Sequence, residues 1–210
     1  MFRATVFAAI GLVTVTGACA QPPNSKNSPT VGVYMEFESV PGGQSLTAMK
    51  REVDALLEPA GIKLNWRLSR ENHGDEIFSR LVMLKFTGAC RADWSVQNTP
   101  RDESVSVGDT QVVQGRVLPF SEVRCNVVRR ALSFLAPAAS REKRQEALGI
   151  ALGRVVAHEL YHVLARTTLH AEHGLAKASQ PLKDLISEQG ITFREQDAEA
   201  IRKGLESTTN

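Results

Sequence analysis

The sequence lacks both a long apolar run and a stripe of charge of one sign. Its first apolar stretch, from Ala4 to Val15, is shorter than the about 20 residues that a membrane-spanning helix needs, and no later stretch reaches that length without charges. The 25 Lys and Arg residues are interspersed with 23 Asp and Glu residues, for a formal net charge of +2. The short apolar runs therefore argue against a transmembrane segment, and the interspersed charges do not support a nucleic-acid partner.

Internal repeats and low-complexity tracts are also absent, which excludes solenoid and fibrous architectures. A chain of 210 residues can form one ordinary domain with a sizeable core. We therefore expect a short flexible leader at 21–29, a single domain over 30–210, and a monomer.

The first twenty residues have the pattern of a secretory signal peptide. A positive charge at Arg3 precedes the apolar run, and a small-x-small cleavage pattern ends at Ala20. Cleavage there predicts a secreted or periplasmic protein. The stretch around Cys19 also resembles a lipoprotein processing site, in which this cysteine would carry the lipid. Because Thr16 stands where such sites usually have Leu, simple cleavage is favoured over lipidation.

Cysteine is scarce, with three residues in the chain. Removal of the signal peptide leaves Cys90 and Cys125, an even pair in an oxidising compartment, so a disulfide is favoured over a metal role. Such a bond would stabilise the fold by roughly 3 to 4 kcal/mol. Two separate buried thiols are the alternative.

Alternation of apolar residues predicts strands at 30–39 and 62–69. The apolar run 77–86 predicts a third strand, and 110–120 predicts a broken strand with Gly115 and Pro119 near its ends. Pro119 indicates that the last of these strands lies at a sheet edge. The polar stretch 87–109 is typical of a surface loop.

Helical spacing of apolar residues follows the first strand and dominates the second half of the chain. Ser45 is predicted to cap a helix that runs to about Glu58, and a further helix covers 124–136. Ser140 is predicted to cap the longest helix, which ends at about Ala165. Thr192 and Glu195 suggest a capping box for a final helix, which ends at about Leu205. The elements together predict an α+β fold.

Four of the five histidines fall in the segment 155–174, and three residues there form the pattern H-E-x-x-H. Four residues of a helix advance about 400° and 6 Å, so His158 and His162 project from one face and can share a metal ion. Glu159 is rotated by about 100°, which suits a general base beside a metal-bound water better than a ligand.

A catalytic metal site needs a third protein ligand, and the helix cannot supply it, since residues further along it lie out of reach. The helix must therefore end, and the β-branched pair Thr167-Thr168 is a place for it to break. His170 and His173 are then the candidate ligands. Weaker candidates are Glu172, Glu188 and Glu199.

These residues resemble the zincin metallopeptidases, in particular metzincin-like members with a third histidine after a turn. Ala165 and Thr168 hold the positions where the usual run has Gly and His. The sequence is more similar to a compact bacterial secreted variant in which the third ligand is followed by Gly and an aliphatic residue, here His170, Gly174 and Leu175. Ala176 stands where this variant usually carries Met.

The resemblance implies a zincin-like mixed sheet with a long active-site helix and a small helical C-terminal part. It implies one catalytic Zn²⁺ bound by His158, His162 and His170, with Glu159 as the general base and a protein or peptide as the substrate. His173 is the reserve ligand, or a donor to the oxyanion. Tyr161 is expected to be a packing residue.

Two functions therefore follow from the sequence. The first is a secreted zinc-dependent metalloprotease, a hydrolase that cleaves peptide bonds with metal-activated water. The alternative is a non-catalytic exported binding or structural protein with a zinc-stabilised fold, which would recruit both His170 and His173 to make four ligands. Glu159 favours the enzyme, because a purely structural site has little use for it.

Overall fold

The computed structural model describes residues 29–71, 74, 77–93, 106–135, 139–178, 184–187 and 190–207. The predicted signal peptide, Cys19, the leader up to residue 28 and the candidate ligand Glu188 lie outside these ranges. Among the described residues, no helix combines the length and the apolarity that crossing a membrane requires.

Five strands form one sheet in the order β2-β1-β3-β5-β4. The strands are β1 (Thr30–Phe37), β2 (Lys63–Leu68), β3 (Arg80–Thr87), β4 (Gly108–Val113) and β5 (Arg116–Arg124). Neighbours from β2 to β5 pair in parallel, and β4 pairs antiparallel with β5 at one edge. The predicted mixed sheet is therefore confirmed.

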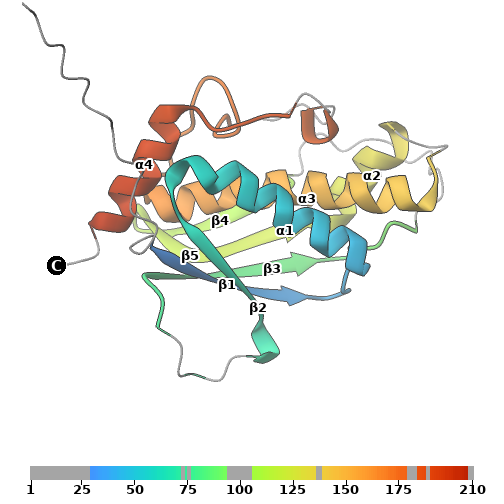
Figure 1. Cartoon of the computed structure of the whole chain (residues 1–210), viewed down its shortest axis with the longest axis horizontal. Helices are drawn as coiled ribbons and strands as arrows, with labels where there is room; N and C mark the ends of the chain where they lie inside the picture. The colour runs from blue at the N-terminus through green and yellow to red at the C-terminus, as the bar shows by residue number, and fades with distance from the viewer. Residues whose placement is uncertain are drawn as a thin grey trace, which may run out of the picture.

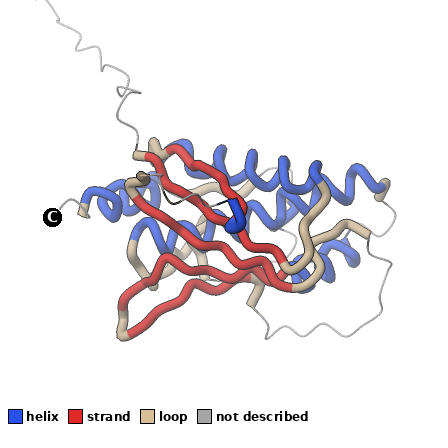
Figure 2. The backbone as a smooth tube through the Cα atoms, turned by 90° about the horizontal axis from the view of Figure 1, so that it is seen from below, coloured by secondary structure: helices blue, strands red, loops and turns tan. Residues whose placement is uncertain are grey.

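Within the described residues, four α-helices complete the fold: α1 (Gly43–Leu57), α2 (Cys125–Leu135), α3 (Arg141–Ala165) and α4 (Glu195–Glu206). Helices α1 and α3 run side by side over one face of the sheet, and α4 packs at the end of α3 (Figure 1). Seen from below, the strands lie in front of the helices (Figure 2). The predicted α+β class is confirmed.

The core lies between the sheet and the helices. On β3 the alternate side chains of Val82, Leu84 and Phe86 are fully or almost fully buried, as the alternation of the sequence predicts. From α3 they meet Leu152 and Leu160, also fully buried. Each buried side chain of this size stabilises the fold by about 1.5 to 3 kcal/mol.

Two glycines on α3 let α1 approach closely. A Cβ at Gly149 would lie 2.5 Å from the Cβ of Ala48, and one at Gly153 would lie 2.8 Å from the Cβ of Glu52. Any larger residue would push the two helices apart. This contact fixes α3 against α1 and leaves another side of α3 to face β4.

The predicted disulfide joins Cys90 to Cys125, with 4.9 Å between the Cα atoms. Both cysteines are fully buried. Because Cys125 is the first residue of α2, the bond ties the chain after β3 to the start of that helix.

Of the two predicted serine caps, one is wrong and one is confirmed. Gly42, not Ser45, caps α1, because the Ser45 hydroxyl donates instead to the carbonyl of Gln145 on α3, 2.9 Å away. The predicted cap Ser140 of α3 is confirmed, since its hydroxyl accepts from the N–H of Lys143. In the first case a tertiary partner takes the hydroxyl that the helix end could have used.

The capping box of α4 lies two residues later than predicted. The N–H of Arg194 donates to the Asp197 carboxylate at 2.9 Å, and α4 begins at Glu195. Thr192 is still outside the helix, because its carbonyl accepts from the N–H of Leu175. Glu195 pairs with Arg202 instead of capping.

The segment predicted as one broken edge strand is a hairpin. Strands β4 and β5 are joined by Gln114 and Gly115, both with positive φ, and β4 begins inside the predicted surface loop. β5 lies between β3 and β4, so the edge position predicted from Pro119 is wrong. Pro119 is tolerated because the register with β4 is irregular there and the pairing with β3 begins only at Phe120.

Candidate metal centre

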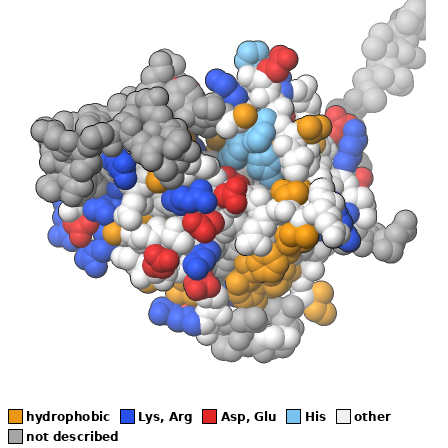
Figure 3. Space-filling view, turned by 180° about the vertical axis from the view of Figure 1, so that it is seen from behind, with side chains coloured by type: hydrophobic (Ala, Val, Ile, Leu, Met, Phe, Trp, Pro, Cys, Tyr) orange, Lys and Arg blue, Asp and Glu red, His pale blue; other side chains and the backbone are white. Residues whose placement is uncertain are grey.

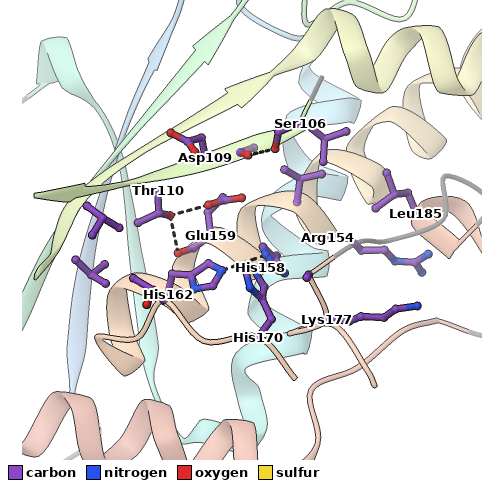
Figure 4. Close-up of a pocket in the computed structure, with 17 residues that line it drawn as sticks. Ser106, Asp109, Thr110, Arg154, His158, Glu159, His162, His170, Lys177 and Leu185 are labelled. Carbon is purple, nitrogen blue, oxygen red and sulfur yellow. Dashed lines mark hydrogen bonds between the residues drawn. The ribbon is translucent and has the colours of Figure 1, made fainter. Parts of the chain in front are cut away.

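Three histidines converge at the side of α3 that faces the antiparallel edge of the sheet. One nitrogen each from His158, His162 and His170 lies within 4.8 Å of the other two, a spacing that can hold a metal ion (Figure 4). His158 and His162 come from α3, and His170 comes from the chain that follows it. On one face of the molecule, histidine side chains are visible as a central patch and as a separate group at the edge (Figure 3).

The chain reverses after α3 to bring the third histidine back. Arg166 adopts the left-handed conformation at φ 53°, and its N–H donates to the carbonyl of His162. The N–H of Thr167 donates to the same carbonyl at 3.1 Å. The helix thus ends where the β-branched pair predicted a break.

Backbone carbonyls orient two of the three rings. Nδ1 of His158 lies 2.8 Å from the carbonyl oxygen of Leu175, and Nδ1 of His162 lies 2.8 Å from that of Thr167. Because a carbonyl can only accept a hydrogen bond, each Nδ1 carries the proton and each Nε2 presents a lone pair. The rings are therefore set as ligands before any ion arrives.

The two lone pairs face one another. Nε2 of His162 and Nε2 of His158 are 3.2 Å apart, and neither carries a proton in this arrangement. Two such acceptors repel at that distance unless a proton or a cation lies between them. Burial lowers the pKa of His158 to about 4, and burial also lowers the pKa of His162, so protonation is disfavoured near neutral pH. The geometry fits a cation.

Glu159 points from α3 toward β4 and is 4 % exposed. Burial raises the pKa of its carboxyl to about 7, and the hydrogen bond from Thr110 opposes this rise. The Thr110 hydroxyl donates to Oε2 at 2.6 Å (Figure 4). A carboxyl with a pKa near 7 can both accept and release a proton at neutral pH.

The histidines and Glu159 line a pocket of about 290 Å³ between α3, β4 and the chain that follows α3. Its lining includes the apolar side chains of Val107, Val112 and Leu185. Charged side chains also border the pocket, among them Asp109 and Lys177. The pocket therefore offers a ligand both apolar and charged surfaces next to the histidines.

Other candidate ligands lie elsewhere. His173 and Glu172 are exposed, and neither belongs to the histidine group found in the part of the chain that the structure describes. Glu199 pairs with Lys203 on α4. Tyr161 is 6 % exposed and stacks on Phe193, which agrees with its predicted packing role.

Sequence reasoning missed the residues of β4 that contact Glu159. Gly108 and Thr110 lie two residues apart on one face of the strand, and Thr110 is 49 residues from Glu159 in the sequence. No local spacing connects residues so far apart. The strand alternation could have placed both on one face, but the segment up to 109 was predicted as a loop.

The sequence matches no family model and no curated protein. Its resemblance to zincin metallopeptidases therefore rests on the residues of the site alone. The function has to be argued from the histidine group, the buried carboxyl and the pocket around them.

Proposed function

We propose that the protein is a zinc-dependent metallopeptidase that hydrolyses peptide bonds with Glu159 as the general base. One observation carries the proposal: a buried carboxyl lies beside three histidines whose nitrogens converge at the wall of an open pocket. A metal that only stabilised the fold would have no use for this carboxyl. Metal-assisted hydrolysis needs it.

The donor set suits zinc. Three neutral imidazoles are a common ligand set of catalytic zinc, and nitrogens at 2.0 to 2.1 Å from a tetrahedral ion lie about 3.3 Å apart. The Nε2 atoms of His158 and His162 are 3.2 Å apart. His158, His162 and His170 would hold the ion, and zinc in such a site polarises a carbonyl and makes water acidic near neutral pH.

The chain's own residues then provide proton transfer and positioning. Glu159 takes the proton of the attacking water at a carboxylate oxygen and returns it to the leaving amine. The carbonyls of Leu175 and Thr167 keep the two helix-borne imidazoles in the tautomer that presents Nε2. The apolar side chains that line the pocket limit the access of water molecules other than the one that attacks.

The antiparallel edge of the sheet supports a peptide as the substrate. β4 pairs with β5 on one side, stands last in the strand order, and contributes Gly108, Asp109 and Val112 to the pocket. An extended peptide can add to such an edge through backbone hydrogen bonds. That placement would bring a peptide bond past the histidines.

We also propose that the protein acts outside the cytoplasm, as its predicted signal peptide suggests. The disulfide between Cys90 and Cys125 supports this, because such bonds persist in oxidising compartments. The alternative function, a zinc-clamped binding protein, would need four protein ligands, and the described residues gather three.

The decisive experiment compares wild type with Glu159→Gln for zinc content and for hydrolysis of casein and a mixed peptide library. We expect about one zinc per chain in both proteins, and hydrolysis that a chelator abolishes and the variant loses by roughly 10² to 10⁴-fold, the usual contribution of a general base. Glu199→Gln, on the exposed face of α4, is the matched control and should retain activity.

Two results would contradict the proposal. If Glu159→Gln hydrolyses the substrates as fast as wild type, Glu159 is not the general base. Bound zinc with four protein ligands in X-ray absorption, and no hydrolysis by wild type, would establish the structural alternative instead.

A further inference from the structure

The Glu159 carboxylate is held from two sides by β4. Its Oε2 accepts the Thr110 hydroxyl at 2.6 Å, and its Oε1 lies against the backbone of Gly108, where an added Cβ would overlap it. Gly108 is buried, and Val155 of α3 closes the same space. Only glycine at 108 leaves room for the carboxylate in this position.

A second hydroxyl extends the hydrogen bond between Thr110 and Glu159. Thr110 Oγ1 lies 2.8 Å from Oγ of Ser121 on β5, which is 4 % exposed. An ionised carboxylate can only accept, so Thr110 gives its one proton to Glu159 and receives one from Ser121. The three side chains form a directed chain from the sheet to the carboxylate.

We infer that Thr110 is a positioning residue for Glu159, with Ser121 and Gly108 completing the clamp. A free Glu side chain has three rotatable bonds, and catalysis gains when such a group is fixed near its working geometry. The inference rests on the proposed function for its catalytic meaning. It adds that the strand whose free edge would receive the peptide is also the strand that orients the base.

The clamp is tested with Thr110→Val, which keeps the shape of the side chain and removes the hydroxyl. We expect kcat to fall at least about tenfold with KM unchanged, because one hydrogen bond to a charged group is lost from the base. Thr110→Ser keeps the donor and should restore most of the activity. Equal kcat in wild type and Thr110→Val, a change confined to KM, or no rescue by serine would overturn the role.

Thr87→Val is the matched control. Thr87 on β3 also donates to a carboxylate, that of Glu122, at 3.2 Å, but it lies outside the pocket. This substitution removes the same kind of bond from the same sheet. We expect it to leave kcat unchanged.

A second readout does not depend on metal or activity. In chelator-treated protein, Thr110→Val should lower Tm by at least about 3 °C more in the wild-type background than in Glu159→Ala, where the carboxylate acceptor is absent and only the backbone carbonyl of residue 159, at 3.4 Å, remains. If wild type hydrolyses peptides but the two backgrounds show the same change in Tm, the clamp is overturned and the proposed function stands. Coupling without any hydrolysis by wild type would overturn the catalytic role and the proposed function together.

Discussion

At the scale of the residue, two histidines three positions apart in one loop have different surroundings. His170 lies within reach of His158 and His162, whereas His173 is exposed and outside that group. We expect His170→Ala to weaken zinc binding by at least about 100-fold, since a catalytic site keeps only three protein ligands. His173→Ala is the control and should bind zinc as wild type does.

Zinc affinity in a competition assay with a chromogenic chelator measures both variants. Equal loss of affinity in the two would mean that His173 also ligates the ion, as expected for a structural site with four ligands. A loss of zinc affinity in His173→Ala but not in His170→Ala would show that His173 is the third ligand.

The buried Glu159 carboxyl also predicts how pH affects the stability of the metal-free protein. Burial raises its pKa from the ordinary 4.5 to about 7, so its contribution to stability is largest below about 4.5 and is lost as pH rises through 7. Glu159→Gln is neutral throughout. We therefore expect the variant to gain roughly 2 kcal/mol over wild type between about pH 5.5 and 8.5.

Urea unfolding with a chelator present at both pH values measures this difference. His158 acts in the opposite sense, because folding lowers its pKa from 6.5 to about 4, so its contribution to stability is lost as pH falls from 6.5 through 4. It is common to both proteins and cancels in the comparison. A stability difference that does not change with pH would contradict the assignment.

Residue spacing predicted the histidine group but not the clamp on Glu159. His158 and His162 are one helical turn apart, so a local rule connects them. Thr110 meets Glu159 only because β4 ends up beside α3, and no local rule contains that fact. The choice of His170 over His173 came from a resemblance, and the spacing alone left it open.

At the scale of the element, a buried arginine connects two α-helices and the short 3-10 helix η4 (Asp184–Ile186). Arg154 of α3 is 4 % exposed and donates to Glu52 of α1 at 2.8 Å. It also donates to the carbonyls of Asp184 and Ser187, next to the pocket residue Leu185. The arginine therefore holds one wall of the pocket against the helix that carries the histidines.

We expect Arg154→Met to destabilise the protein by roughly 2 to 4 kcal/mol, because it leaves a carboxylate and two carbonyls without their partner. Arg51→Met is the matched control, since Arg51 joins the same two helices through Glu146 but is exposed. It should cost less than about 1 kcal/mol. Urea unfolding compares them, and equal losses would show that burial of the arginine does not matter.

Periodicity predicted most elements because alternation and helical spacing reflect which side faces the core. Their ends were harder to predict. Ser45 failed as a cap because Gln145, far away in the sequence, takes its hydroxyl, and Pro119 failed as an edge marker because an irregular register accommodates it. In both cases a partner distant in the sequence overrides the local preference.

At the scale of the whole molecule, the class of fold could be predicted but the arrangement of strands could not. Strands β1 and β2 pair in parallel, and α1 is the crossover helix that connects them. The order of the remaining strands depends on how β5 inserts between β3 and β4, which composition does not encode. Likeness to zincins in overall shape remains a prediction.

The three histidines belong to one short segment, 158–170, whereas the clamp on Glu159 needs a strand from the first half of the domain. Contacts between neighbours in sequence form early in folding, and contacts that close a sheet form late. In the proposed zinc peptidase, the three ligands would therefore come together before the sheet sets the base. Hydrolysis would then begin only once the sheet is complete, after the ion is already bound.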